Sequence, residues 1–167
     1  PLSTIYIGGG TPSILNPLQI KDLINLFKES YGIDYGAEIT MEVDPASFNE
    51  DDLYGFIKAG INRFSLGVQS FNNQVLEQAG RRHCSKDVEK SCFWLKRAYD
   101  HGLIKSWSLD LIQNLPRSGF KKWQEDLKQS LKFCPPHISI YDLSIENGTV
   151  FKKLVDLGKL SLPDDDE

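Results

Sequence analysis

Cysteine is scarce in this sequence, and its few cysteines suit neither a disulfide framework nor a zinc site. Cys84, Cys92 and Cys134 are odd in number and widely spaced among 167 residues. Disulfide scaffolds and zinc sites instead show even, closely spaced cysteines. Isolated cysteines of this kind are most often reduced and partly buried. We therefore expect three free thiols and assign no metal-binding residue.

Long apolar runs and an excess of basic residues are also missing. No run approaches the roughly 18 apolar residues of a membrane span, and residues 1–4 lead into an apolar segment without the pattern of a signal peptide. There are 19 Lys and Arg against 23 Asp and Glu, a net charge of −4, whereas nucleic-acid partners favour a basic excess. We expect a cytoplasmic protein with no membrane span and no nucleic-acid partner.

Short apolar runs alternate with amphipathic stretches along the whole chain, which is long enough for one domain with a real core. The runs predict strands, and the stretches between them show apolar residues at helical spacing. Asn16, Asn49 and Ser85 are predicted helix N-caps. Alternation of this kind indicates an α/β fold with a parallel sheet, either open or closed into a barrel. The expected strands are residues 4–7, 38–43, 61–68, 104–112 and 138–143.

Polar residues or glycines cluster at the carboxyl-terminal end of each expected strand. In a parallel barrel all carboxyl ends of the strands open on one face, where active sites lie. In an open sheet the site gathers at one crevice instead. Polar groups after every strand therefore favour the barrel. They are Gly8-Gly9-Gly10-Thr11, Glu42 and Asp44, Gln69, Asp110, and Ser144 and Glu146.

Several of these residues have both a binding and a plain structural interpretation. The glycine run lets a ligand approach the backbone closely, or it makes a tight turn. Glu42 and Asp110 lie in apolar strands, where a carboxylate is costly unless it has a partner such as a ligand. The plain structural alternative is that each carboxylate lies at a strand end exposed to solvent. Arg81 suits a bidentate pair with a carboxylate, or it is a surface arginine. His83 is expected behind the binding residues or on the surface, not as a metal ligand.

Taken together, the motifs resemble one family, in its order and over nearly the whole chain. That family is the radical S-adenosylmethionine (SAM) group that holds oxygen-independent coproporphyrinogen III oxidases and related haem chaperones. This chain matches five motifs of that family in turn. They are a Gly-Gly-Gly-Thr-Pro loop, a Glu-x-Asp-Pro strand end, an Arg-x-Ser-x-Gly-Val-Gln-Ser-Phe segment, a Gly-Arg pair and the strand that follows that pair. The matching segments are residues 8–13, 41–45, 62–71, 80–81 and 108–112.

The resemblance implies an α/β fold, a parallel partial barrel of the radical SAM type, of which this chain supplies strands two to six. Residues 1–160 would be a core fragment, and residues 161–167 would begin the connection to a C-terminal region. The family's Cys-x3-Cys-x2-Cys motif for a [4Fe–4S] cluster is absent here and is expected upstream of Pro1. Without three thiolate ligands this segment holds no such cluster, so the fragment alone is expected to be inactive.

The resemblance also implies a role for each matching residue toward SAM. The backbone of Gly9, Gly10 and Thr11 would meet the methionine end, and Arg81 would pair with the carboxylate. The remaining roles are ribose hydroxyl binding for Gln69 and Asp110, ammonium or ribose binding for Glu42, and a place near the adenosyl group for Ser144.

Two functional branches of the family remain open, besides an unrelated ligand on a plain barrel fragment. In the oxidase branch, a reduced cluster cleaves SAM to a radical that drives oxidative decarboxylation of coproporphyrinogen III to protoporphyrinogen IX. In the other branch, the scaffold binds haem and delivers it to acceptor proteins. Residues 141–151 resemble the chaperone branch, whereas residues 114–118 depart from the family's Gly-Leu-Pro-Gly/His-Gln loop. Tetrapyrrole contacts are expected in the C-terminal region.

Overall fold

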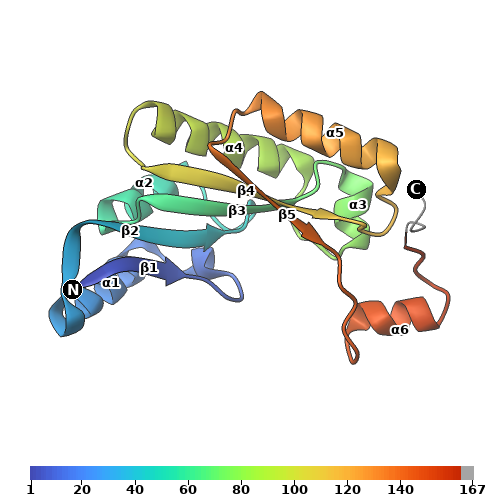
Figure 1. Ribbon diagram of the computed structural model, residues 1–167, viewed down its shortest axis with the longest axis horizontal. Helices are drawn as coiled ribbons and strands as arrows, with labels where there is room; N and C mark the ends of the chain where they lie inside the picture. Colours follow the sequence, from blue (N-terminus) through green and yellow to red (C-terminus); the bar gives the residue numbers. More distant parts are fainter. Residues whose placement is uncertain (163–167) are drawn as a thin grey trace.

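The computed structural model describes residues 1–162, in which strands and helices alternate (Figure 1). The elements in chain order are β1 (Leu2–Ile7), a 3-10 helix η1 (Pro12–Ile14), α1 (Pro17–Tyr31), β2 (Ile33–Val43), α2 (Glu50–Ala59), β3 (Arg63–Gln69), α3 (Asn73–Gln78), α4 (Ser85–Asp100), β4 (Ser106–Gln113), α5 (Gly119–Lys132), β5 (His137–Asp142) and α6 (Val150–Asp156).

The strands form one parallel sheet in the order β1-β2-β3-β4-β5. Doubly wound open sheets reverse their strand order at a switch point. This order never reverses, so the chain winds in one direction, as in a barrel. The five strands make half a barrel, and all their carboxyl ends point the same way (Figure 1). The predicted α/β partial barrel is confirmed, and the open sheet is excluded.

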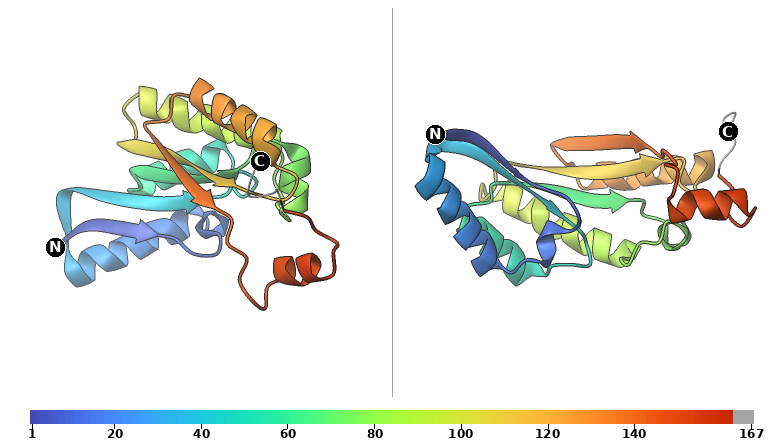
Figure 2. Two further views of the ribbon diagram at one scale, coloured as in Figure 1. Left: turned by 45° about the vertical axis from the view of Figure 1, so that its right-hand side comes forward. Right: turned by 90° about the horizontal axis from the view of Figure 1, so that it is seen from below.

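The hydrophobic core lies between the sheet and the helices on one of its faces (Figure 2). Side chains alternate between the two faces of a strand. Alternate residues of β2, β3 and β4 accordingly point to the helices, and Met41, Phe64, Leu66, Trp107 and Leu109 have no exposed surface. The other face of these strands is left for polar residues, which is the face that continues into the site.

Helix N-caps mostly follow the sequence prediction. Asn16 caps α1 and Asn49 caps α2, each within a capping box. The prediction of Ser85 as a cap was wrong, because Cys84 caps α4 and Ser85 is its first helical residue. Asp87 explains the difference: its Oδ2 accepts hydrogen bonds from the Cys84 backbone N–H at 3.0 Å and from the Cys84 Sγ at 3.1 Å.

Helix α5 departs from its predicted apolar face. Phe120, Trp123, Leu127 and Leu131 are spaced as one helix face, which predicts that they pack together; Trp123 and Leu127 are partly buried against the core, but Phe120 and Leu131 are 57% and 63% exposed. The buried residues of α5 include two polar ones, Asp126 and Ser130. Asp126 is buried where it hydrogen-bonds the turn that follows β3, on the side of α5 that faces the rest of the protein.

Helix α6 lies beyond the carboxyl ends of the strands, apart from the helices that cover the sheet (Figures 1 and 2). Thr149 caps it by accepting a hydrogen bond from the Lys152 N–H at 3.2 Å. The predicted connection over residues 161–167 lies mostly outside the described residues. Within residues 1–162, no helix has the length and apolar character needed to cross a membrane.

Candidate functional site

A cavity of about 300 Å³ lies at the carboxyl ends of the strands. Six of the eight predicted site residues line it, namely Gly10, Thr11, Glu42, Gln69, Arg81 and Asp110. Gly9 does not itself line the cavity, but its N–H donates to Oε2 of the lining residue Glu42 at 3.0 Å. The structure does not bring Ser144 into this group. Ser144 lies exposed after β5, and its Oγ donates to Glu146 Oε1 at 3.0 Å.

Strand periodicity places the lining residues on one face of the sheet. Ser65, Gly67 and Gln69 alternate along β3, and Asp110 and Ile112 alternate along β4, and all five line the cavity. Residues two apart in a strand share a face. Glu42 pairs in register with Ser65 in the neighbouring strand. The cavity is thus the polar face of the half-barrel at its open end.

The glycine loop and Tyr6 hold Glu42 in place. The Tyr6 hydroxyl donates to Glu42 Oε1 at 2.9 Å, on the carboxylate that also accepts from Gly9. A Cβ on Gly8 would lie 2.8 Å from the Tyr6 ring and 2.9 Å from Glu42 Oε1. Tyr6 is 60% exposed, but partial desolvation of its hydroxyl, followed by the Glu42 hydrogen bond and charge, raises its pKa to about 12. Glu42 therefore presents a fixed carboxylate at the cavity wall.

Asp110 offers an unused acceptor. Its Oδ2 accepts a 2.6 Å hydrogen bond from Ser65 Oγ, while its buried Oδ1 has no partner. Burial raises the pKa of this carboxyl above its ordinary value of 3.8, and the Ser65 bond opposes that shift. A buried acceptor without a donor is unfavourable in a folded protein. Asp110 also lines the cavity, so its carboxylate is placed to accept a hydrogen bond from a hydroxyl or ammonium donor of a ligand.

Gln69 adopts an unusual backbone conformation at the end of β3. Its φ is 67°, in the left-handed region that side chains other than glycine rarely adopt. Its Nε2 lies 2.9 Å from where a Cβ of Gly67 would be. The missing side chain of Gly67 therefore leaves room for the Gln69 amide at the cavity.

Arg81 and His83 lie on the loop between α3 and α4 and reach the cavity from the side. Burial raises the pKa of Asp44, but His83, the Ala46 N–H and the charge of Arg81 together hold it below its ordinary value. His83 is buried, with Nδ1 3.4 Å from Asp44 Oδ2 and Nε2 3.1 Å from the Val68 carbonyl. His83 thus joins the ends of β2 and β3 behind the cavity, and Arg81 stays exposed.

The cysteines contribute nothing to this site. Cys84 caps α4, Cys92 is buried in the core and Cys134 is exposed after α5. Burial, with a smaller effect of the charge of Glu89, raises the pKa of the Cys92 thiol, which makes it unreactive. Across residues 1–162, no group of three His, Cys, Asp or Glu side chains is placed to hold a metal ion.

Sequence reasoning missed several residues that shape the cavity. Ser65 anchors Asp110, Tyr6 anchors Glu42, and Ile112 and Tyr141 add apolar surface to the lining. The strand period of two was the signal that could have found Ser65 and Ile112. Ser65 lies four residues before Gln69, and Ile112 lies two residues after Asp110. Tyr6 lies on β1, and only the pairing of β1 with β2 brings its hydroxyl to Glu42.

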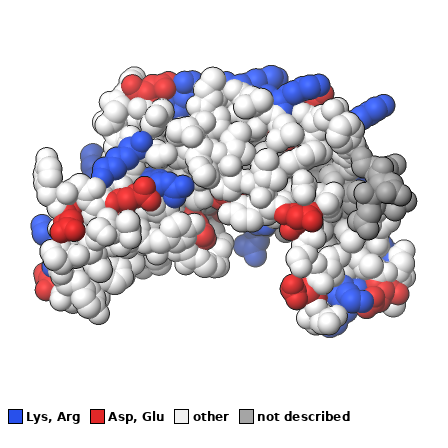
Figure 3. Space-filling model, in the orientation of Figure 1, with Lys and Arg blue, Asp and Glu red and all other residues white. Residues whose placement is uncertain are grey.

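Charge on the surface is mixed. On the face that Figure 3 shows, basic side chains gather along the edge formed by α4 and α5, and both signs occur elsewhere. The net charge is −4. An anionic group in the cavity would therefore depend on Arg81 as a local partner, not on a broad positive field.

Residues 1–122 match the family model described as the radical SAM superfamily. The chain is 40% identical over 163 residues to the haem chaperone HemW of Synechocystis and 37% identical over 165 residues to that of Escherichia coli. These matches cover 98% and 99% of this chain, but only 39% and 42% of the relatives.

The fold is also similar to the solved structure of the E. coli coproporphyrinogen III oxidase HemN, a radical SAM enzyme. That similarity has a TM-score of 0.82 at 29% identity, over 98% of this chain and 37% of that one. The chain therefore spans about two fifths of the length of the proteins to which it is similar.

Proposed function

This chain belongs to the radical SAM superfamily, and we propose that its cavity binds SAM in a protein that binds and delivers haem. One observation carries the SAM assignment. The cavity unites a guanidinium, two oriented carboxylates, an amide and a glycine loop, on Arg81, Glu42, Asp110, Gln69 and Gly10.

The residues present fit SAM in charge and in hydrogen-bonding capacity. SAM carries a carboxylate, an ammonium group and two ribose hydroxyls. The carboxylate of Asp110, which lines the cavity, can accept from a hydroxyl, and Glu42, fixed by Tyr6 and Gly9, can accept from the ammonium or a hydroxyl. Arg81 is free to form the bidentate pair that guanidinium and carboxylate geometry favours.

The residues present do not fit an iron–sulfur cluster. Such clusters are held by cysteine thiolates, and none of the three cysteines lines the cavity. SAM bound beside a reduced cluster supplies a carbon radical in this superfamily. The residues described here act before that chemistry, because they bind and orient the ligand.

Orientation is the contribution that the cavity makes. Glu42 and Asp110 place a hydrogen-bonded carboxylate on each side of the β3 end, and Arg81 adds a guanidinium. Together these three groups would set the orientation of the ligand. Because the two carboxylates are held by Tyr6, Gly9 and Ser65 before any ligand arrives, binding costs them little side-chain ordering. Preorganised polar groups of this kind are the protein's share of cofactor chemistry.

The haem part of the proposal is supported by residues 146–151 and by the relatives. Glu146, Gly148, Thr149 and Phe151 match the Glu-x-Gly-Thr-x-Phe pattern of the chaperone branch, and here they build the cap of α6. The curated relatives quoted above are haem chaperones. Oxidation of coproporphyrinogen III is the second candidate, supported by the similarity to HemN.

One experiment separates the two functions in the full-length protein. The protein is reconstituted without oxygen and titrated with haem, and it is separately given SAM, a reductant and coproporphyrinogen III. We expect saturable haem binding, seen as a shift of the Soret band, without protoporphyrinogen. Formation of protoporphyrinogen, or the absence of haem binding, would contradict the chaperone proposal.

We also propose that the protein works in a reducing compartment such as the cytoplasm. All three of its cysteines are free, whereas oxidising compartments favour disulfides. Recovery of the protein in a secreted fraction would contradict this.

A further inference from the structure

The end of β3 contains a strained turn at the cavity wall. The Ser70 N–H donates to the Val68 carbonyl at 2.8 Å, which closes a three-residue turn around Gln69, whose φ is 67°. A γ-turn with positive φ at its centre is rare and strained. A residue in such a conformation persists only where its surroundings fix it. The structure shows which group does so.

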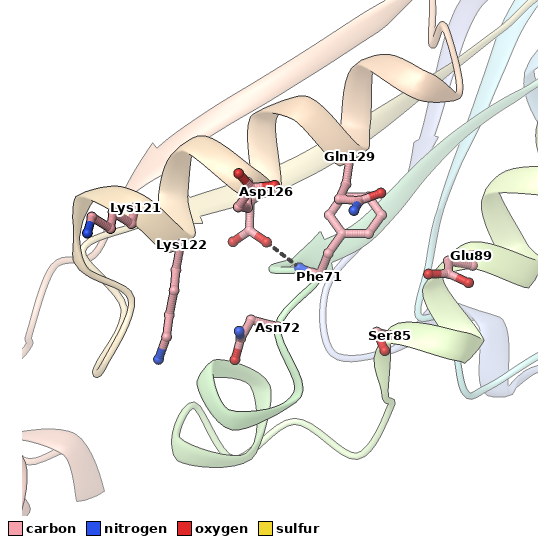
Figure 4. A pocket seen from close by; sticks show the side chains of 9 residues that line it. Phe71, Asn72, Ser85, Glu89, Lys121, Lys122, Asp126 and Gln129 are labelled. Carbon is pink, nitrogen blue, oxygen red and sulfur yellow. Dashed lines mark hydrogen bonds between the residues drawn. The ribbon is translucent and has the colours of Figure 1, made fainter.

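Asp126 of α5 holds the two residues that follow Gln69 (Figure 4). Its Oδ2 accepts from Ser70 Oγ and its Oδ1 accepts from the Phe71 N–H, both at 2.7 Å. Ser70 Oγ accepts in turn from the Asn72 N–H at 3.0 Å. Asp126 is only 2% exposed, and the two residues that it binds, Ser70 and Phe71, follow directly after Gln69.

The placement of Asp126 is costly for a residue that served packing alone. It is buried on a helix whose apolar residues Phe120 and Leu131 are exposed. Burial raises the pKa of its carboxyl, although the bonds from Ser70 and Phe71 oppose this. A buried carboxylate is tolerated when its oxygens are satisfied. Here both are satisfied by the turn that carries Gln69.

We propose that Asp126 is a positioning residue for the cavity, which holds the strained turn and thereby directs the Gln69 amide toward the bound ligand. The proposal rests on the assignment of SAM to the cavity. Asp126 itself lies at a separate groove of about 350 Å³ between α3, α4 and α5. Asp126 acts on the ligand through Gln69, which lies 57 positions earlier in the sequence (126 − 69).

Other contacts support the same turn from the opposite side. The imidazole of His83 meets the Val68 carbonyl, and Gly67 leaves the space that the Gln69 amide uses. These contacts border the turn on its β3 side, whereas Asp126 fixes the residues that leave it. Loss of Asp126 would therefore let the exit of the turn relax without removing the strand.

A double-mutant cycle in the reconstituted full-length protein tests the proposal. SAM is titrated into wild type, Asp126→Ala, Gln69→Ala and the double variant. Gln69→Ala removes one hydrogen bond, and we expect Asp126→Ala to weaken SAM binding by a similar factor of about threefold to tenfold. In the Gln69→Ala background the same change should have less than about a twofold effect, because the two residues act as one unit.

Conservative and matched variants separate positioning from stability. Asp126→Asn keeps an acceptor for the Phe71 N–H, so it should bind SAM within about twofold of wild type. Glu125→Gln, one position away and bonded only to Lys128, should also bind as wild type. If Asp126→Ala does not fold, Ser70→Ala, which removes one of the two bonds, takes its place in the cycle.

Four results would overturn the proposal. An equal loss of affinity from Asp126→Ala with and without Gln69 would show that Asp126 acts independently of Gln69. Unchanged affinity in Asp126→Ala, with Gln69→Ala impaired, would refute positioning while leaving the SAM site intact. Saturable SAM binding that none of these variants alters would remove Gln69 from the site, and absence of SAM binding in the wild type would remove the proposed function itself.

Discussion

Among single residues, Glu42 shows most clearly how the cavity is prepared for a ligand. The Tyr6 hydroxyl and the Gly9 N–H both donate to its carboxylate, and the bare Cα of Gly8 lets Tyr6 and Glu42 approach. A hydrogen bond to a charged group is stronger than one between neutral groups. Glu42 is thereby fixed between the buried residues Met41 and Val43 of its strand.

The pKa of Tyr6 reports directly on this contact. Burial and then Glu42 raise it from 10.0 to about 12, so Glu42→Gln, which removes the charge, should lower it toward 10. The pKa of Tyr6 in the folded protein lies above its ordinary value. The stability linked to its neutral hydroxyl is therefore present below about pH 10 and is lost as the pH rises toward 12. Tyrosine Cζ chemical shifts through a pH titration measure the change, with Tyr6→Phe to identify the signal.

Arg81 gives a second test at a single side chain. Arg81→Ala should weaken SAM binding by about 1.5–3 kcal/mol, the usual range for a hydrogen bond to a charged group. Arg82→Ala is the matched control, because Arg82 is also exposed but does not line the cavity. Equal affinities in the two variants, measured by calorimetric titration, would make Arg81 a surface residue.

Among helices and strands, local signals predicted more than packing did. Asn16 and Asn49 were recognisable because an N-cap needs only its own side chain and the next turn of backbone. The apolar face of α5 was not predictable, since the buried Asp126 binds a turn 55 residues away. The N-cap of α4 was predicted one position too late, at Ser85. The actual cap is a cysteine, which is not among the residues usually found at N-caps.

The loop before α5 contains a conformational penalty that substitution should relieve. Arg117 stands where the family pattern has Gly or His, and its φ is 60°, in the region that disfavours a Cβ. Arg117→Gly should raise the free energy of unfolding by about 0.5–1 kcal/mol, after the entropy that glycine adds to the unfolded chain. Urea unfolding measures it. Arg117→Ala keeps the Cβ, so it should give no gain, and an equal gain from alanine would contradict the backbone explanation.

For the molecule as a whole, the half-barrel was predictable from alternation and from the polar residues that follow each strand. Most of the site was predictable too, because Gly10, Glu42, Gln69 and Asp110 follow strands whose carboxyl ends must share one edge. The structure places Ser144 elsewhere, because the chain leaves the sheet after Asp142. The supports given by Tyr6 and Ser65 depend on sheet register, which the sequence alone does not specify.

Asp110 connects the cavity with the stability of the whole fold. Burial raises its pKa above 3.8, so the folded state is penalised where Asp110 is ionised, and the penalty fades as the pH falls through the raised pKa toward 3.8. Asp110→Asn should therefore raise the melting temperature at pH 8, with a gain that disappears near pH 4, and should weaken SAM binding. Thermal unfolding against pH measures this, and a gain that does not depend on pH would exclude the carboxylate as its cause.

The assignment of SAM to this cavity is tested most directly by a crystal structure of the full-length protein, reconstituted without oxygen and grown with SAM. We expect the carboxylate of SAM at Arg81, and its ribose or ammonium within hydrogen-bonding distance of Asp110 and Glu42. SAM bound elsewhere, with the Oδ1 of Asp110 still unpartnered, would contradict the assignment.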